Sequence, residues 1–350
     1  ATDIYIPGKD VFDLVLKRLY STGNAESYAI IEADDKKIHK ESVKTFGWGW
    51  SLNIPYISKD SRGWYVRLPD GQEITLHFTI RDKEYEYHKG VHFKVKKIKD
   101  GVFQDPRFRL DMKDGTRYVF DRMRRLEKIE KPGVTHAIVF TYKSDSPKKI
   151  DKITDTFGNE VKFSYNGDFI KTITVPGING DVTHTYGYTD GRLTSYTDPD
   201  PDSDSDPDSN PDPDPDGRVT TYEYNNWDNI ETGIYFKQDD EISDDMLTVD
   251  FYLLDKIGYP TGGSSEYSYD LITESYSKTW NSGHYSKSGY KPVVKSNDRG
   301  DMNTGGIYKH TSYTYRMNSE KVRLDNKIPV SVILKNSQIF GCTVDDGNKI

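Results

Sequence analysis

Cysteine is almost absent from this chain of 350 residues, since Cys342 is the only one. A single cysteine cannot close an intramolecular disulfide, and it cannot supply the clustered thiolates of a structural metal site. Long apolar runs are absent too, and no stretch approaches the roughly 20 residues that a membrane-spanning helix needs. The first 20 residues also lack the apolar core of a secretory signal peptide. The sequence therefore predicts neither a disulfide-stapled domain nor insertion into a membrane.

Alanine is scarce as well, with five residues against 26 tyrosines, 14 phenylalanines and five tryptophans. Alanine favours helix, whereas aromatic and β-branched residues favour the half-buried surface of a sheet. Only residues 11–20 fit a helical period, and they fit a strand equally well. The composition therefore predicts an all-β fold.

A basic surface is also lacking. The formal net charge is −8, and nine aspartates lie between Asp198 and Asp216. Without these nine the net charge would be −8 + 9 = +1. The rest of the chain is close to neutral, without the basic footprint of a nucleic-acid-binding protein. The small cluster of Lys94, Lys96, Lys97 and Lys99 is better explained as the solvated face of a strand. We therefore expect no nucleic-acid partner.

What the sequence does contain is a repeat. Aromatic-x-aromatic pairs recur at Tyr118/Phe120, Phe140/Tyr142, Phe163/Tyr165, Tyr186/Tyr188, Tyr222/Tyr224, Tyr267/Tyr269 and Tyr313/Tyr315. The first three steps between pairs are 22 or 23 residues, and the fourth, of 36 residues, becomes 22 once 14 residues of the acidic insert are set aside. The last two steps, of 45 and 46 residues, are about twice that length. Each pair lies in a segment of period two, and a turn and a second short strand follow it. A fixed period of this length indicates a repeat architecture built from β-hairpins of about 22 residues.

The repeat divides the chain in two. Residues 1–117 are rich in strand and turn signals but have no period, and they include the aromatic and glycine cluster Phe46-Gly47-Trp48-Gly49-Trp50. We expect them to form a β region that caps or begins the array. Residues 118–350 form the array itself, interrupted at residues 199–216 by an insert of alternating Asp, Pro and Ser that cannot build a core.

The repeat resembles the YD repeat of bacterial Rhs proteins, the Tc-toxin cocoon and the teneurins. The resemblance rests on Tyr188-Thr189-Asp190-Gly191-Arg192-Leu193, on Asp216-Gly217-Arg218-Val219, on Gly47-Trp48-Gly49-Trp50-Ser51, and on Tyr259-Pro260-Thr261-Gly262-Gly263. It implies a β-hairpin ribbon or solenoid, a curved sheet that is part of a spiral shell, secreted or displayed at the cell surface. It also implies a toxin cargo or a cell-surface protein or glycan as partner. The signature that closes Rhs shells is absent, which suggests a piece of a longer polypeptide.

One motif suggests a metal. Asp212, Asp214 and Asp216 precede Gly217, and Glu223 follows, which completes the D-x-D-x-D-G-x₅-E order of a calcium loop. Against calcium stand the prolines at 213 and 215 and the fit of residues 216–224 to the repeat without any metal. Asp202, Asp204 and Asp206 lack the glycine and form a weaker second candidate. The alternative is a solvated, disordered loop.

The remaining candidates have simpler explanations. His77, His88 and His92 could hold a metal but are more readily exposed strand histidines, and His184 is expected to be a packed polar residue. Trp48 and Trp50 could stack on a sugar, although a buried cluster explains them better. No catalytic motif is present. The sequence thus favours a structural shell or surface module that is not an enzyme, and the alternative is a calcium-dependent adhesin that binds glycan or protein.

Overall fold

The computed structural model describes residues 2–9, 12–22, 45–60, 63–76, 84–87, 92–98, 106–178, 180–199, 218–238, 241–280, 283–301, 307–312 and 345–347. Apart from single 3₁₀-helical residues at Lys9 and Thr22, the elements assigned among these residues are all β-strands, which confirms the all-β prediction. Residues 11–20, for which the sequence left helix and strand open, contribute a strand at Leu14–Tyr20. No helix able to cross a membrane occurs in the part of the chain that the structure describes.

The chain divides into two compact units, one of residues 1–21 and 39–218 and the other of residues 22–38 and 219–350. The predicted boundary after residue 117 lies within the first unit. The strands of the first unit are β1 (Thr2–Ile6), β2 (Leu14–Tyr20), β3 (Trp50–Leu52), β4 (Tyr56–Asp60), β5 (Gly63–Arg67), β6 (Glu73–Leu76), β7 (Glu84–Tyr87), β8 (Phe93–Ile98), β9 (Arg107–Met112), β10 (Arg117–Phe120), β11 (Leu126–Glu130), β12 (Ile138–Tyr142), β13 (Ile150–Thr154), β14 (Glu160–Asn166), β15 (Phe169–Gly177), β16 (Gly180–Thr189) and β17 (Arg192–Asp198).

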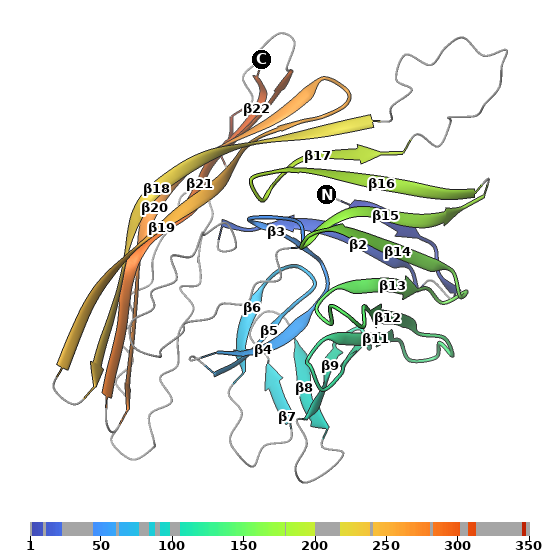
Figure 1. The fold of residues 1–350 in the computed structure, drawn as a ribbon, viewed down its shortest axis with the longest axis horizontal. Helices are drawn as coiled ribbons and strands as arrows, with labels where there is room; N and C mark the ends of the chain where they lie inside the picture. Colours follow the sequence, from blue (N-terminus) through green and yellow to red (C-terminus); the bar gives the residue numbers. More distant parts are fainter. Residues whose placement is uncertain are drawn as a thin grey trace. The chain divides into compact units, whose positions relative to one another are not determined.

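These strands pair antiparallel with their neighbours in the chain. Two small sheets have the orders β1-β2-β3 and β4-β5-β6, while β7 to β17 follow one another side by side in a larger sheet (Figure 1). Within the larger sheet, β10–β11, β12–β13, β14–β15 and β16–β17 are four successive hairpins. Each contains one of the predicted aromatic pairs on its first strand, so these four hairpins lie where the sequence predicts them.

Turn residues end these strands where the sequence predicts. Asp190 and Gly191 both have positive φ, at 49° and 73°, and lie between the paired residues Thr189 and Arg192. This is the geometry of a two-residue type I′ hairpin, which favours Asp-Gly because both central residues need positive φ. A longer turn of residues 155–159 joins β13 to β14.

The second unit differs from the prediction in strand length. Its strands are β18 (Arg218–Gln238), β19 (Glu241–Gly258), β20 (Gly263–Trp280), β21 (Gly283–Asp301), β22 (Ile307–Ser312) and β23 (Asp345–Gly347). The first two pairs, β18–β19 and β20–β21, are antiparallel hairpins much longer than the predicted repeat unit of about 22 residues. The predicted unit length was wrong here because the ladders continue past Tyr224 and Tyr269 until Gln238 and Trp280, with no intervening turn.

The buried face of the four hairpins is covered by the N-terminal segment. Successive contacts along it are hydrogen bonds donated by backbone nitrogens: Lys9 N to the side-chain Oγ1 of Thr156 (2.7 Å), Ile170 N to Thr45 O (2.7 Å) and Trp48 N to Gly191 O (3.0 Å). The core between them contains Leu14 and Leu16 from β2 and Phe140, Phe163 and Ile173 from the hairpins, all with an exposed fraction of 5% or less. Burial of this apolar surface is the main force holding the segment on the array.

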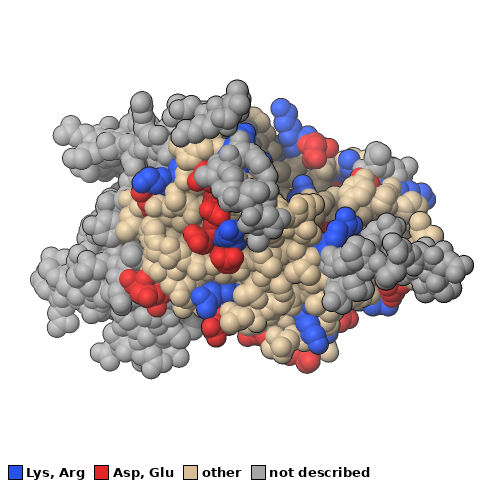
Figure 2. Space-filling model, turned by 90° about the horizontal axis from the view of Figure 1, so that it is seen from above, with Lys and Arg blue, Asp and Glu red and all other residues tan. Residues whose placement is uncertain are grey.

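Charged side chains are interspersed over the surface. On the face in Figure 2, lysine and arginine side chains lie beside aspartate and glutamate side chains. Among the predicted strand-face lysines, Lys94 and Lys96 on β8 extend to Glu84 and Glu86 on the adjacent β7, with N to O distances from 2.9 to 3.5 Å. The solvated-face prediction is thus confirmed for these two lysines, while Lys99 lies outside the described residues.

Candidate functional site

The predicted calcium ligands fall mostly outside the described residues, since Asp212, Asp214 and Asp216 all lie in residues 200–217. The weaker candidates Asp202, Asp204 and Asp206 lie there too. Glu223 is on β18 and is exposed, with the buried Tyr222 before it. It pairs across the strands with Lys256, whose ammonium group is 2.8 Å from Glu266. Among the described residues no three His, Cys, Asp or Glu side chains form a group able to hold a metal ion. The calcium loop stays a prediction.

The candidate histidine and tryptophan residues are placed in part. His77 and His88 lie outside the described residues, and His92 is exposed just before β8. Trp50 is 5% exposed and packs edge-on against Tyr20, with 5.3 Å between ring centroids. The buried cluster is therefore confirmed for Trp50. Trp48 is half-buried, and its indole lies against Gly191, where a Cβ atom would come within 3.1 Å of Nε1.

The second aromatic residue of each pair makes a contact that recurs along the array. Three tyrosines of the first unit each donate a hydrogen bond from the hydroxyl to a backbone carbonyl of the preceding hairpin: Tyr142 to Leu126 (2.8 Å), Tyr165 to Ile150 (2.8 Å) and Tyr188 to Ile170 (2.9 Å). In the second unit Tyr269 donates in the same way to Leu254 (2.6 Å). Each acceptor is the apolar residue that pairs across its own hairpin with the preceding aromatic, such as Leu126 with Phe120. We call these four hydrogen bonds the tyrosine ties.

A β-bulge places each of these tyrosines. The strand register shifts between Thr141 and Tyr142, between Ser164 and Tyr165, between Gly187 and Tyr188, and between Ser268 and Tyr269. A bulge inserts one unpaired residue and re-aims the side chain beside it. The tyrosine can then reach back to the neighbouring hairpin. Burial raises the pKa of Tyr142 and Tyr165 well above 10, which keeps both hydroxyls protonated as donors.

The least expected feature is an ion pair in the core. The guanidinium of Arg18 on β2 donates from Nε to Oδ2 of Asp3 on β1, and both side chains are at most 2% exposed. Tyr186 on β16 donates its hydroxyl to the same oxygen at 3.1 Å. The guanidinium carbon lies 4.3 Å from the ring centre of Tyr196 and 5.6 Å from that of Trp50. Aromatic faces attract a desolvated cation, so this cage offsets part of the cost of burying the charge.

Another bulge brings Asp3 into the core. Thr2 pairs with Lys17 and Ile4 pairs with Leu16, so Asp3 is the extra residue of β1. On β2 the buried residues alternate as Leu14, Leu16 and Arg18. Sequence analysis missed this pair. Only Arg18 could have been recognised from the sequence. It occupies an inward-facing position of a strand of period two, and a charged group buried there needs a partner of opposite charge.

His184 extends this polar cluster. Its Nδ1 lies 2.9 Å from the hydroxyl of Tyr196 and 3.5 Å from Oδ1 of Asp198. The whole residue is 6% exposed. Burial lowers the pKa of His184, and this effect outweighs the opposing attraction of Asp198 and Asp3. The prediction of a packed polar histidine is confirmed. Because the ring is enclosed and its near neighbours are hydrogen-bonded, the cluster serves to hold β16 and β17 against the N-terminal strands.

Comparison with known proteins adds little. No known protein family and no curated protein matches the chain. Among solved structures, the N-terminal domain of effector protein SpvB from Salmonella typhimurium strain LT2 aligns over 91% of this chain and 95% of that one. The identity is 10% and the TM-score 0.21, a level at which the alignment supports no conclusion about fold or function.

Proposed function

We propose that this chain is a wall segment of a YD-repeat shell, or a related surface module, of a secreted or cell-surface protein. In this role it encloses or presents another polypeptide, such as a toxin, and carries out no catalysis. The observation on which the proposal rests is the series of tyrosine ties. Three successive hairpins are each fastened to the preceding hairpin by the same side chain in the same place. Such nearest-neighbour fastening supports a repeat array whose purpose is to hold its shape.

The hydrogen bonds of the buried polar side chains also support the proposal. Buried polar side chains of the hairpins, His184 and Tyr186 among them, bond to one another or to the N-terminal strands. These bonds stabilise the packing of the N-terminal strands on the hairpins.

Protection from proteolysis tests this role. The chain is produced within its complete natural polypeptide and digested with a nonspecific protease, and the lifetime of the segment after the array is measured. If the array is a shell, that segment survives at least tenfold longer than the same segment produced alone. Equal lifetimes would contradict the proposal.

The second candidate is a calcium-dependent adhesin, favoured by the loop order at Asp212, Asp214, Asp216 and Glu223. Isothermal titration of calcium into the wild type and into Asp212→Ala/Asp214→Ala tests the ion site. An adhesin requires heat at millimolar calcium that the variant loses, together with glycan or protein binding that a chelator abolishes. Equal heats in the two proteins, or none in either, would leave residues 199–216 as a solvated spacer.

A further inference from the structure

The N-terminal strands lie on the hairpins without being paired to them. Strands β1, β2 and β3 form a sheet of their own, and among the described residues no strand pairing joins it to the larger sheet. We call residues 2–9, 12–22 and 45–53 the N-terminal layer. Side-chain packing and single hydrogen bonds, such as Trp48 N to Gly191 O, hold it in place. Strands β14 to β17 are instead joined by backbone ladders. The contact between the layer and the hairpins can therefore open while the hairpins stay paired.

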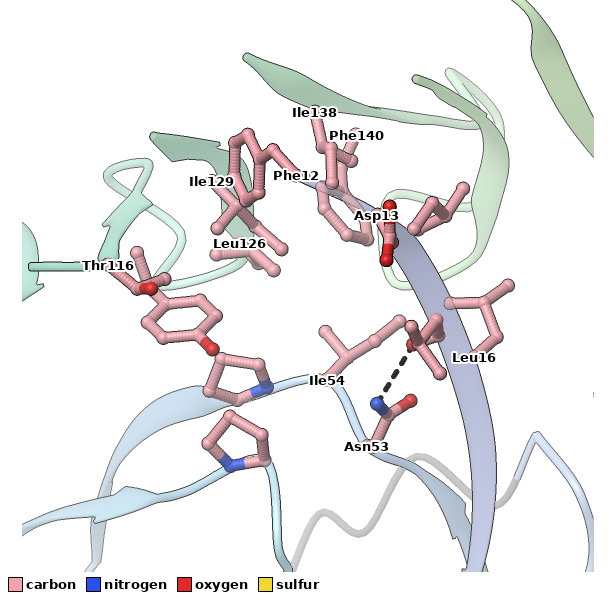
Figure 3. A pocket seen from close by; sticks show the side chains of 15 residues that line it. Phe12, Asp13, Leu16, Asn53, Ile54, Thr116, Leu126, Ile129, Ile138 and Phe140 are labelled. Atoms are coloured by element: carbon pink, nitrogen blue, oxygen red, sulfur yellow. Dashed lines mark hydrogen bonds between the residues drawn. The ribbon is translucent and has the colours of Figure 1, made fainter. Parts of the chain in front are cut away.

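The packing of this layer is incomplete over β10 to β12. A cavity of about 200 Å³, partly open to solvent, lies there between residues 12–16, residues 53–55 and the hairpin strands, with Tyr118 in its wall. Figure 3 shows Phe12 and Leu126 among the side chains around it. Side chains that border such a space lose contacts that a close-packed interior provides. The layer is thus held less firmly here than a complete core would hold it.

Over β16 and β17 the contact is polar and includes His184. The ring of Tyr196 contacts the guanidinium of Arg18 on one strand of the layer, and it lies parallel to the ring of His184, at 8° and 6.0 Å between centres. The charged groups that act on His184 are Asp3 on β1, Arg18 on β2 and Asp198 on β17. A proton on His184 would add a second buried positive charge near Arg18, while Asp3 is already paired with that arginine.

Burial therefore opposes protonation of His184 while the layer is closed. Its pKa is lowered because the loss of solvent outweighs the attraction of Asp198 and Asp3. The side chain of Asp198 is 42% exposed, so water weakens its attraction. Opening the layer returns the ring to water, where it binds a proton more readily. By linkage, each proton taken up favours the open state.

A second histidine meets the layer at Lys9. Nε2 of His136, in the turn between β11 and β12, lies 3.3 Å from Nζ of Lys9. A neutral imidazole can accept a hydrogen bond from the ammonium group, whereas a protonated one has no acceptor and repels it. Both side chains are exposed, so the repulsion is weak. It acts in the same direction as the charging of His184.

We propose that the N-terminal layer is an acid-sensitive latch, which opens more often when His184 and, to a smaller extent, His136 become protonated. Opening uncovers the apolar face of the hairpins that contains Phe140, Phe163 and Ile173, while the backbone ladders remain. Histidine suits this role because its charge changes between pH 5 and 8. The latch goes beyond the shell proposal, since it requires only that the layer covers the hairpins.

Amide hydrogen exchange of the full chain at pH 7.5 and pH 5.5 tests the latch, with each rate divided by its intrinsic rate. The reporters are the amides of Lys9, Trp48 and Ile170, which donate hydrogen bonds across the contact. We expect them to exchange faster than amides inside the β14–β15 ladder, through a local opening. This opening should become about three- to tenfold more frequent at pH 5.5, because an exposed histidine with a pKa of about 6.5 takes up its proton over this interval.

Variants assign the effect to the ring. His184→Gln cannot titrate and should reduce the change between the two pH values to less than about twofold. His136→Gln should remove a smaller part of it. His92→Gln is the matched control, since His92 is exposed just before β8, and it should keep the full change. Should His184→Gln fail to fold, the His184 ring is titrated by NMR in the wild type, and its midpoint must match the pH dependence of the opening.

Three results would overturn the latch. They are exchange of the reporter amides only together with the ladder amides, an opening that does not change with pH, and a pH effect that persists in folded His184→Gln. The proteolysis test of the shell is carried out at neutral pH, where the latch is closed. Failure of one proposal therefore leaves the other intact.

Discussion

The turn of residues 155–159 shows how single residues fix the hairpins. Asp155 is 4% exposed, and its carboxylate accepts hydrogen bonds from the backbone nitrogens of Phe157 and Asn159, both at 2.8 Å. The fourth residue, Gly158, has φ of +91°, in the left-handed region that costs an L-residue about 1–2 kcal/mol. In the turn between β10 and β11 the residue at the same position is Arg124, with φ of 66°, so a non-glycine residue adopts this conformation there.

Gly158→Ala should therefore lower the free energy of unfolding by about 1–2 kcal/mol, from backbone strain alone. A Cβ atom at Gly158 would meet nothing within 4 Å, so no steric clash contributes. Urea denaturation measures the effect. Gly158→Asn serves as the control, since asparagine adopts positive φ more readily, and it should cost less. An alanine variant as stable as the wild type would show that the turn has another conformation.

His184 should make stability depend on pH. Its pKa is lowered in the folded state, so below about pH 6.5 the unfolded chain binds a proton that the folded protein does not. Stability contributed by the neutral ring is thus complete above pH 6.5 and is lost as the pH falls, by up to about 1.4 kcal/mol per pH unit. The groups facing the ring are Tyr196, Asp198, Asp3 and Arg18.

The measurement is urea denaturation at pH 7.5 and at pH 5.5. His184→Gln has no titrating ring and should lose less stability between the two pH values than the wild type. The same loss in both proteins would mean that other groups carry the acid sensitivity.

At the scale of the strand and hairpin, the tyrosine ties explain why a degenerate repeat still gives a regular sheet. A lone hairpin is marginal in water, so each one depends on its neighbours. The bulge turns the second aromatic residue toward the preceding hairpin. In the case of Tyr165, the hydroxyl then donates a hydrogen bond to the backbone carbonyl of Ile150. Each of the four ties therefore joins a hairpin to the one before it in the chain.

Tyr142→Phe and Tyr165→Phe should each cost about 1 kcal/mol, the net value of a neutral hydrogen bond. Tyr165→Ala and Tyr188→Ala should cost about 2–4 kcal/mol, because the packing of the ring is lost as well. Tyr5→Phe provides the control, since Tyr5 is 59% exposed and the hydrogen bond from its hydroxyl to Asp13 is on the surface. A surface change of this kind should cost no more than about 0.5 kcal/mol. If both internal Phe variants matched this control, the ties would be geometric contacts without energetic weight.

At the scale of the whole molecule, the ion pair of Asp3 and Arg18 joins distant parts of the first unit. Asp3 and Tyr186 are 183 residues apart in the chain, yet their side chains share a hydrogen bond. Removing one member of a buried pair leaves an uncompensated charge, which typically costs about 3–5 kcal/mol. Replacing both members with apolar residues costs much less.

Asp3→Ala should therefore destabilise the first unit by about 3–5 kcal/mol. Asp3→Leu/Arg18→Met should be more stable than Asp3→Leu or Arg18→Met alone, and its loss of stability should fall short of the sum of the two single losses by a coupling energy above about 1 kcal/mol. A double-mutant cycle from urea denaturation measures this coupling. Additive effects would show that the two residues stabilise the fold independently.

Much of this fold could be predicted from the sequence. The period of two places Phe140, Phe163 and Tyr186 on the buried face, and Asp-Gly at 190–191 sets a tight turn. These features depend on residues close in the chain, so local pattern and turn chemistry are sufficient to determine them. The long strands after residue 218 were missed because period two says where side chains point and not where a ladder ends.

Only the tertiary structure decided how the N-terminal segment lies across the hairpins. The bulge that turns Asp3 inward, the cage of aromatic rings around Arg18, and the cavity beside Tyr118 all arise where strands distant in sequence meet. Burial and electrostatic pairing act over space and leave no period in the chain. The sequence by itself thus determined the strands, the turns and the inward face of the repeat, and packing between distant segments determined which of those side chains became a core, an ion pair or the wall of a cavity.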